Sequence, residues 1–163
     1  MTETTPGRRG GRQLPTAEEL RIWRDFIETT QALGARLESR LQGDSALSTG
    51  DYAVLLALSE AQDKAMRSSE LASRIGWERS RLSHHLGRME RRGLVRRQEC
   101  ATVPRGSEVL LTPAGAEAFG GATFPHLRAI REFFVDALSP EQVLAAGEIA
   151  AALRAHLDVL RKE

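Results

Sequence analysis

The chain of 163 residues contains one cysteine, few aromatic residues and no long apolar segment. The lone cysteine, Cys100, excludes an internal disulfide and any metal cluster built from several cysteines of one chain. No segment approaches the roughly 20 apolar residues that span a bilayer, and the N-terminus lacks the apolar core of a signal peptide. We therefore expect a cytoplasmic protein that is not inserted in a membrane.

The sequence also lacks the patterns that mark catalytic and metal sites. His84 and His85 are adjacent, so on a helix their side chains would point about 100° apart and could not bind one metal ion together. His126 and His156 are isolated in the sequence. No nucleophile accompanied by an acid–base pair is recognisable. We predict that the protein is not an enzyme and uses no cofactor or metal ion.

Charge is distributed unevenly along a chain whose net charge is only +1. Residues 67–97 hold nine arginines and three glutamates, a net charge of +6, which leaves −5 for the remainder. Such asymmetry indicates a surface that faces a polyanion. At this point DNA, RNA and an anionic membrane all remain open.

The two ends of the chain predict a flexible tail and helices. Residues 1–14 have almost nothing to bury and should form the tail, whereas residues 15–47 have a capping box, Thr16 with Glu19, and apolar residues at helical spacing. Residues 113–163 predict two more helices, the second starting at Ser139-Pro140. Its apolar face has no obvious cover within so small a domain: Val143, Ala146, Ile149, Leu153, Leu157 and Leu160. A second copy would cover it, so we expect these terminal helices to dimerise.

Residues 48–112 predict a DNA-binding module. A buried helix follows the cap formed by Ser48 and Asp51, and two shorter helices then flank a tight turn at Gly76. After Gly93 the period changes to that of strands, 94–99 and 108–112, around a turn-rich segment. The predicted fold is mainly α with a small β-wing: a winged helix-turn-helix with N- and C-terminal dimerisation helices.

The helix after Gly76 divides into two faces. We predict that Leu82, His85, Leu86 and Met89 point inward. The opposite face has the donors that a major groove requires, since an Arg fork can bridge O6 and N7 of guanine. We expect the following contacts with DNA: Ser80, Arg81, His84 and Arg88 in the major groove, Ser68, Ser69 and Arg79 on the backbone, and Arg105, at the wing tip, in the minor groove.

Four segments together resemble the MarR family of bacterial regulators: Ser69-Glu70-Leu71-Ala72, Glu78 to Met89, Glu90 to Val95, and Leu111-Thr112-Pro113-Ala114-Gly115. The resemblance covers nearly the whole chain and implies a two-fold dimer on a pseudo-palindromic operator, with recognition helices in successive major grooves. Three departures stand out. The wing stretch Val103-Pro104-Arg105 lacks the family's Asp two residues before its Arg. Arg67 and Glu78 occupy helix-cap positions where Ser or Thr is common, and we expect Ser68 to take over as one cap.

The resemblance also bears on what the protein senses. Oxidant-sensing members place their reactive cysteine in the first helix, where this chain has none, so we expect Cys100 to be inert. Four aromatic residues lie on elements that enclose a cavity in similar proteins: Trp23, Phe26, Tyr52 and Phe119. They indicate either a pocket for a small aromatic or lipophilic effector or ordinary core packing.

These observations predict a sequence-specific DNA-binding transcriptional regulator that acts as a homodimer. Repression is expected, since blocking a promoter needs only tight binding, and an effector could release the protein from its operator. The alternative is a winged-helix architectural protein or protein-interaction adaptor whose DNA binding is non-specific.

Overall fold

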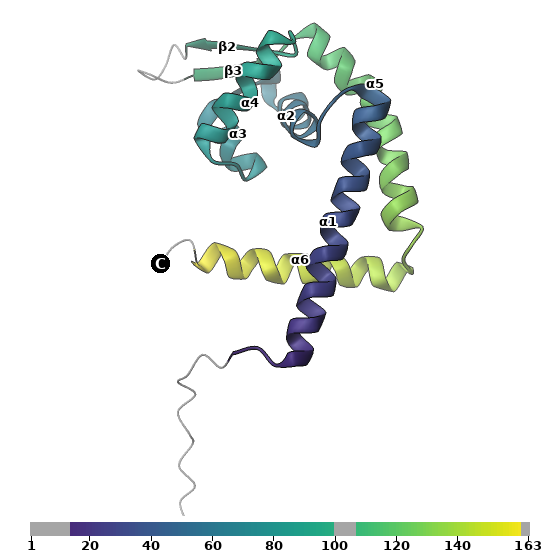
Figure 1. Ribbon diagram of the computed structural model, residues 1–163. Helices are drawn as coiled ribbons and strands as arrows, with labels where there is room; N and C mark the ends of the chain where they lie inside the picture. Colours follow the sequence, from purple (N-terminus) through teal and green to yellow (C-terminus); the bar gives the residue numbers. More distant parts are fainter. Residues whose placement is uncertain (1–13, 100–106, 161–163) are drawn as a thin grey trace, which may run out of the picture.

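The computed structural model describes residues 14–99 and 107–160. Cys100 and Arg105 lie outside the described residues. The chain is mostly helical with a small three-stranded antiparallel sheet, so the predicted fold class is confirmed. Figure 1 shows a compact lobe, which contains the sheet, and long helices that extend away from it.

Helix α1 (Ala17–Ser45) begins at the predicted capping box. The amide of Glu19 donates to the Thr16 hydroxyl over 3.2 Å, and the Glu19 carboxylate accepts from the Thr16 amide over 2.7 Å. The helix ends at Ala46, whose φ of 56° stops the helical path. It therefore lies within residues 15–47, the range in which the sequence predicted a helix.

The first three helices of the lobe follow in quick succession. Helix α2 (Thr49–Glu60) starts at the predicted cap, Ser48 with Asp51, and buries most of its apolar residues. Helix α3 (Ser68–Ile75) ends at Gly76, which adopts φ 69°. Helix α4 (Arg79–Arg91) is followed by Arg92 and then by Gly93, which adopts φ 74°. These left-handed glycines allow the sharp turns that a helix-turn-helix requires.

The sheet has the order β1-β3-β2. Strands β2 (Val95–Glu99) and β3 (Ser107–Leu111) form the predicted hairpin, with Arg97 opposite Val109. Strand β1 (Ala65–Arg67), which the sequence did not predict, pairs with the other edge of β3 after a short 3-10 turn, η1 (Gln62–Lys64). Three residues are too few to show an alternating pattern, and the strand forms because β3 offers a free edge.

The beginning of α5 (Pro113–Ile130) is fixed tightly to the hairpin. The Thr112 hydroxyl donates to the carbonyl of Gly93 over 2.6 Å and accepts from the amide of Gly115 over 2.9 Å. A Cβ at Gly115 would lie 2.0 Å from the Leu94 carbonyl oxygen, so the close approach requires glycine. The helix continues through Pro125 into a π-helical segment, η2 (Arg131–Val135), before α6 (Pro140–Leu160).

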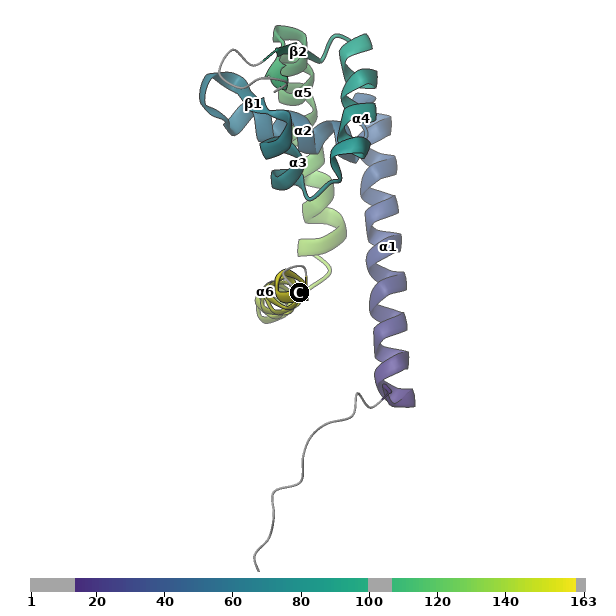
Figure 2. The same cartoon turned by 90° about the vertical axis from the view of Figure 1, so that its left-hand side faces the viewer.

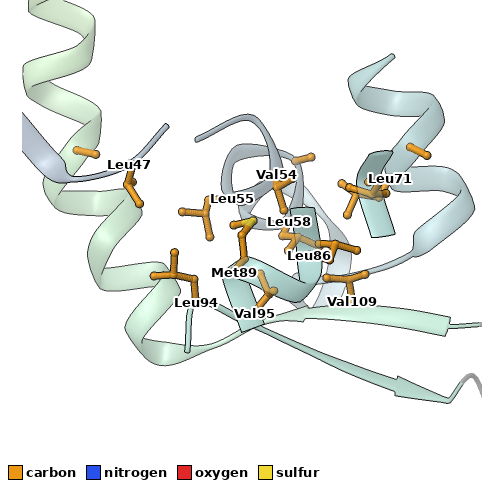
Figure 3. Packing of buried hydrophobic residues seen from close by; sticks show 14 of the residues in the cluster. Leu47, Val54, Leu55, Leu58, Leu71, Leu86, Met89, Leu94, Val95 and Val109 are labelled. Carbon is orange, nitrogen blue, oxygen red and sulfur yellow. The ribbon is translucent and has the colours of Figure 1, made fainter. Parts of the chain in front are cut away.

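One hydrophobic core occupies the lobe between the sheet and helices α2, α3 and α4 (Figure 3). Each of these elements contributes fully buried side chains, including Leu55, Leu58, Leu71, Leu86, Met89 and Val109. Burying such side chains stabilises the fold by about 1.5–3 kcal/mol each, so this core holds α4 in a defined orientation.

Helices α1, α5 and α6 lie mainly outside the lobe. Helix α1 packs beside α5, whereas α6 stands apart from both and is seen end-on in Figure 2. Large apolar side chains are exposed along these helices, among them Trp23 (59%), Phe124 (68%), Leu144 (70%), Leu153 (49%) and Leu157 (58%). None of the helices in the described part of the chain is both long enough and apolar enough to cross a membrane.

Candidate nucleic-acid interface

The two predicted faces of α4 are present. Leu82, His85, Leu86 and Met89 are buried, as predicted. Ser80, Arg81, His84 and Arg88 are all exposed on the same helix. The split follows from the helical period, which places positions three and four residues apart on one side. The structure therefore presents hydroxyl, imidazole and guanidinium groups together on the outer side of α4.

Helices α3 and α4 begin without side-chain caps. Arg67 and Glu78 are their N-cap residues, and neither side chain makes a capping hydrogen bond to the described residues. The expectation that Ser68 caps α3 is wrong, because Ser68 is already the first helical residue. First-turn amides that have no acceptor from the N-cap side chain, together with the positive end of the helix dipole, favour an anion such as phosphate.

A groove of about 180 Å³ lies beside these two helix starts. It brings together the three residues predicted to contact the DNA backbone: Ser68, Ser69 and Arg79. Arg97 and Ser107, from the base of the hairpin, line the same groove. Sequence reasoning did not select these last two residues, because only the pairing of β2 with β3 shows which hairpin residues lie beside α3.

Arg97, which lines the groove, is held in place by Glu90. The Glu90 carboxylate accepts from Nε and Nη2 of Arg97 over 3.0 and 2.8 Å, and from its backbone amide over 2.9 Å. These bonds to the Arg97 amide and guanidinium lower the pKa of Glu90. The charge of Arg97 is thus partly balanced before any ligand arrives.

Arg81 is ordered by Trp77, a residue that the sequence analysis did not select. The Arg81 guanidinium lies 4.1 Å from the centroid of the Trp77 ring, a cation–π distance. Trp77 in turn packs edge-on against the His85 ring, with centroids 5.0 Å apart. Both rings pack over Gly50, since a Cβ there would lie 2.7 Å from Trp77 and 3.0 Å from His85. Helical spacing could not reveal this contact, because Trp77 lies in the turn before α4.

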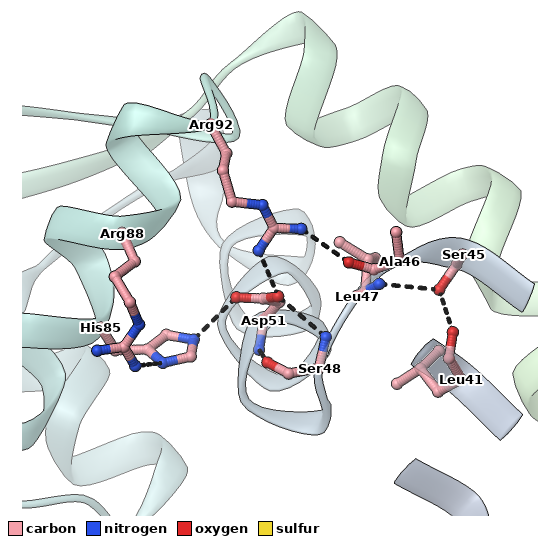
Figure 4. A network of polar contacts seen from close by, with 9 residues as sticks. All are labelled: Leu41, Ser45, Ala46, Leu47, Ser48, Asp51, His85, Arg88 and Arg92. Carbon is pink, nitrogen blue, oxygen red and sulfur yellow. Dashed lines mark hydrogen bonds and ion pairs between the residues drawn. The ribbon is translucent and has the colours of Figure 1, made fainter. Parts of the chain in front are cut away.

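A buried carboxylate, Asp51, connects α4 to the start of α2 (Figure 4). Its Oδ2 accepts from the Ser48 amide over 2.9 Å and from Arg92 over 2.7 Å, and its Oδ1 lies 2.9 Å from Nε2 of His85. Arg92 also donates to the carbonyl of Ala46 over 2.9 Å. Burial alone would raise the pKa of Asp51, but the Arg92 and Ser48 hydrogen bonds and the nearby positive charges outweigh it, so the pKa is lowered.

His85 connects Asp51 to Arg88, which lies on the exposed face of α4. Nη2 of Arg88 lies 2.8 Å from Nδ1 of His85. On the other side of the ring, Nε2 lies 2.9 Å from Oδ1 of Asp51, although the contact is not a well-aligned hydrogen bond. Burial lowers the pKa of His85, and Arg88 and Arg81 lower it further, although Asp51 acts in the opposite direction.

The four candidate effector-pocket residues lie in two separate places. Tyr52 and Phe119 pack together, with ring centroids 5.1 Å apart, and the His126 ring also packs against Tyr52, with centroids 4.5 Å apart. Trp23 lines a groove of about 650 Å³ near the start of α1, and Phe26 is exposed one turn further along. A helix rises about 1.5 Å per residue, so Trp23 lies roughly 27 Å from the buried Leu41 end of α1. Within the described residues these two aromatic pairs do not form one cavity.

Metal-ligating side chains are not gathered in one place within the described residues. Residues 14–99 and 107–160 contain no group of three or more His, Cys, Asp or Glu side chains that could hold a metal ion. His126 has a buried Nδ1 atom that finds no hydrogen-bond partner among the described residues. Burial lowers the pKa of this ring.

A helix-turn-helix followed by a hairpin, with an arginine-rich outer face and an anion-favouring groove, defines a winged-helix DNA-binding protein. A sequence profile of the MarR family matches residues 47–106. AbsC, a MarR family transcriptional regulator from Streptomyces coelicolor, is 35% identical with a TM-score of 0.82, over 93% of this chain and 99% of its own. The chain therefore belongs to the MarR family of transcriptional regulators.

Two further solved structures are informative. Sco3205, a MarR family regulator from Streptomyces coelicolor solved in complex with DNA, is 35% identical with a TM-score of 0.86, over 91% of this chain and 93% of its own. The organohalide-sensing regulator RdhR, solved with 2,4-dichlorophenol, is 19% identical with a TM-score of 0.76, over 96% of this chain and 89% of its own, and shares the fold. A search of curated protein sequences found no match.

Proposed function

We propose that this chain is a repressor that binds a pseudo-palindromic operator as a homodimer. The observation that carries the proposal is the outer face of α4, where Ser80, Arg81, His84 and Arg88 are exposed beside two uncapped helix starts. Side chains of these types can read base edges in a major groove. The solved complex of the 35% identical Sco3205 with DNA supports this use of the fold.

The other contacts divide between backbone and minor groove. Ser68, Ser69 and Arg79 bind phosphates, because they line one groove at two helix N-termini whose N-cap side chains make no cap hydrogen bond. Arg105, which lies outside the described residues, enters the minor groove from the wing tip. Phosphate contacts set the register of the protein on the duplex, and α4 supplies the sequence preference.

Dimerisation uses the helices outside the lobe. Helix α6 exposes an apolar face that includes Ile149 (50%), Leu153 (49%) and Leu157 (58%), and an exposed apolar strip of this kind is a typical protein-interaction surface. We divide the chain accordingly into a tail (1–14), an N-terminal dimerisation helix (15–47), the winged helix-turn-helix (48–112) and C-terminal dimerisation helices (113–163). A second copy would cover α6 with an identical face.

An effector completes the proposal. A small aromatic or lipophilic molecule would bind between the lobe and the dimerisation helices, where Tyr52 and Phe119 pack, or at the groove that contains Trp23, with Phe26 nearby. The complex of the fold relative RdhR with 2,4-dichlorophenol supports a ligand of this class. Release from DNA requires that the ligand bind the two conformations of the dimer with different affinity. The protein would act in the cytoplasm.

The test is selection from a genomic fragment library by the purified protein, followed by salt titrations on the best fragment and on scrambled DNA. The expected result is a pseudo-palindrome bound on the order of a thousandfold more tightly than scrambled DNA. Equal, steeply salt-dependent binding to both would instead indicate the architectural or adaptor role.

A further inference from the structure

We propose that His85 is a positioning residue for DNA recognition, because it fixes the direction of the Arg88 guanidinium through a chain of contacts that begins at Asp51. The inference rests on the proposed function, which makes Arg88 a reader of bases. A buried residue on the inner face of α4 would thus contribute to the base preference of the side chains on its outer face.

The contacts determine which nitrogen of His85 carries the proton. A guanidinium has donors only, so Nδ1 of His85 must be the acceptor in the 2.8 Å contact with Arg88. The proton of the neutral ring is then on Nε2, which faces the Asp51 carboxylate at 2.9 Å. The ring therefore carries its acceptor toward Arg88 and its donor toward Asp51.

Neither the ring nor the carboxylate is free to turn. The Oδ2 atom of Asp51 is held by Arg92 and by the amide of Ser48, over 2.7 and 2.9 Å. The His85 ring is buried, packs against the edge of Trp77 and lies close over Gly50. A fixed ring presents a fixed acceptor, so Arg88 loses less conformational freedom when DNA binds.

Protonation would remove this acceptor. An imidazolium donates from both nitrogens, so it would face the Arg88 guanidinium with a donor and a like charge. The charged groups around the ring are Asp51 from α2, Arg81 and Arg88 from α4, and Arg92, which reaches the ring only through Asp51. Burial and the two α4 arginines keep the pKa of His85 below its ordinary 6.5, so the ring is neutral near pH 7.

Two substitutions separate the acceptor from the bulk of the ring. His85→Asn places an amide oxygen near the Nδ1 position, where it can accept from Arg88, whereas His85→Phe keeps a ring against Trp77 but has no acceptor. Affinities are measured for the selected operator and for a set of operators with one base pair changed at a time. The Arg88→Ala variant identifies the base pair that Arg88 reads.

The expected result is a loss of preference at that base pair, on the order of tenfold, in Arg88→Ala and in His85→Phe. The double variant should lose no more than either single variant, and His85→Asn should retain the preference. Affinity of the His85 variants for scrambled DNA should stay as in the parent protein, because Arg88 is still present. Full discrimination by a folded His85→Phe variant, or additive losses in the double variant, would overturn the inference.

Two further measurements are made on the parent protein, with His85→Asn used for assignment and comparison. The ¹⁵N spectrum of the histidine rings, assigned by comparison with His85→Asn, should show His85 protonated at Nε2; protonation at Nδ1 would refute the proposal. Discrimination at the Arg88 base pair should decrease as the pH falls below 6.5 in the parent protein and stay constant in His85→Asn. If the parent protein shows no preference for any operator, the proposed function fails; a preference without coupling between His85 and Arg88 defeats only this inference.

Discussion

Arg92, the residue after α4, donates to the buried carboxylate of Asp51 over 2.7 Å and to the carbonyl of Ala46 over 2.9 Å. One side chain thus closes the junction between the end of α1 and the start of α2. Because Asp51 also contacts His85, the orientation of the recognition helix depends on the same junction. The stability of the lobe and the geometry of its DNA-facing side are therefore linked through Asp51.

Replacing Asp51 by Ala should lower the free energy of unfolding by about 2–4 kcal/mol, since it removes a helix cap and the partner of two nitrogen groups. Asp51→Asn retains an acceptor for the Ser48 amide and should lose less. The matched control is Asp44→Ala, which removes only an exposed pair with Arg40 and should cost under about 0.5 kcal/mol. Urea unfolding measures the free energy of unfolding of all three variants. Equal losses in Asp51→Ala and Asp44→Ala would show that the contacts of Asp51 do not stabilise the lobe.

The histidines predict how stability changes with pH. The folded state lowers the pKa of His85 and His126 mainly through burial, so it takes up protons at lower pH than the unfolded chain does. The free energy of unfolding should be constant above about pH 7.5 and decrease as the pH falls through and below 6.5. Asp51 acts in a separate window, below its ordinary 3.8, because its pKa is also lowered.

The measurement for this pH effect is urea unfolding between about pH 8 and about pH 5. The combined His85→Asn and His126→Phe variant should show a flatter dependence than the parent protein. His156→Gln, at an exposed position of α6, serves as the control for replacing a histidine outside the lobe. An equally steep dependence in the combined variant would show that other groups produce it.

Two glycines of α5 should respond to alanine in opposite directions. Gly115→Ala places a Cβ 2.0 Å from the Leu94 carbonyl oxygen, so the backbone must move and stability should fall by about 2–4 kcal/mol. Gly120→Ala meets no atom of the described residues within 4 Å and should raise stability by about 0.5–1 kcal/mol. Thermal unfolding distinguishes the two, and a neutral Gly115→Ala variant would show that the helix start is less constrained than its contacts indicate.

Arg79→Gln should weaken binding to every DNA sequence by a similar factor, because a phosphate contact carries no base information. The slope of log affinity against log salt should become shallower by about 1. Arg74→Gln is the control, since Arg74 pairs with Glu60 and does not line the groove with Arg79. A loss confined to particular base pairs would instead make Arg79 a base reader.

Leu153→Lys should raise the dissociation constant of the proposed dimer on the order of a hundredfold. The leucines that both copies bury at the interface would be replaced by charged side chains. Glu148→Lys alters the opposite side of α6 and should have little effect on assembly. Sedimentation over a range of protein concentrations gives the dissociation constants. A monomeric parent protein, or equal effects at both positions, would refute the assignment of this face.

The helical period made much of the fold predictable. It gave the two faces of α4, because four inward residues recur at helical spacing, and Ser48 with Asp51 identified the start of α2. The period could not reveal that Asp51 meets Arg92, which lies 41 positions later, because that contact depends on how α2 packs against α4. For the same reason Trp77 was not selected, and the short strand β1 was recognisable only from its partner β3.

The positions of the aromatic residues also could not be predicted from the helical period alone. Tyr52 and Phe119 share a cluster, whereas Trp23 lies far along α1, although all are apolar residues on predicted helices. Sequence patterns specify the side of a helix that a residue occupies. They do not specify which other helix, or which copy of the chain, lies opposite.

The close contact of Gly115 with Leu94 joins the start of α5 and the base of the hairpin into one rigid unit. The hydrogen bonds of Thr112 restrict bending at this point, so in the proposed dimer the spacing of the two hairpins would follow the tilt of α5. A molecule bound against α5 beside Tyr52 and Phe119 would therefore shift the hairpin together with the helix. At its other end α5 runs into Arg131–Val135, where the regular helical hydrogen-bond ladder gives way to a wider π-helical turn.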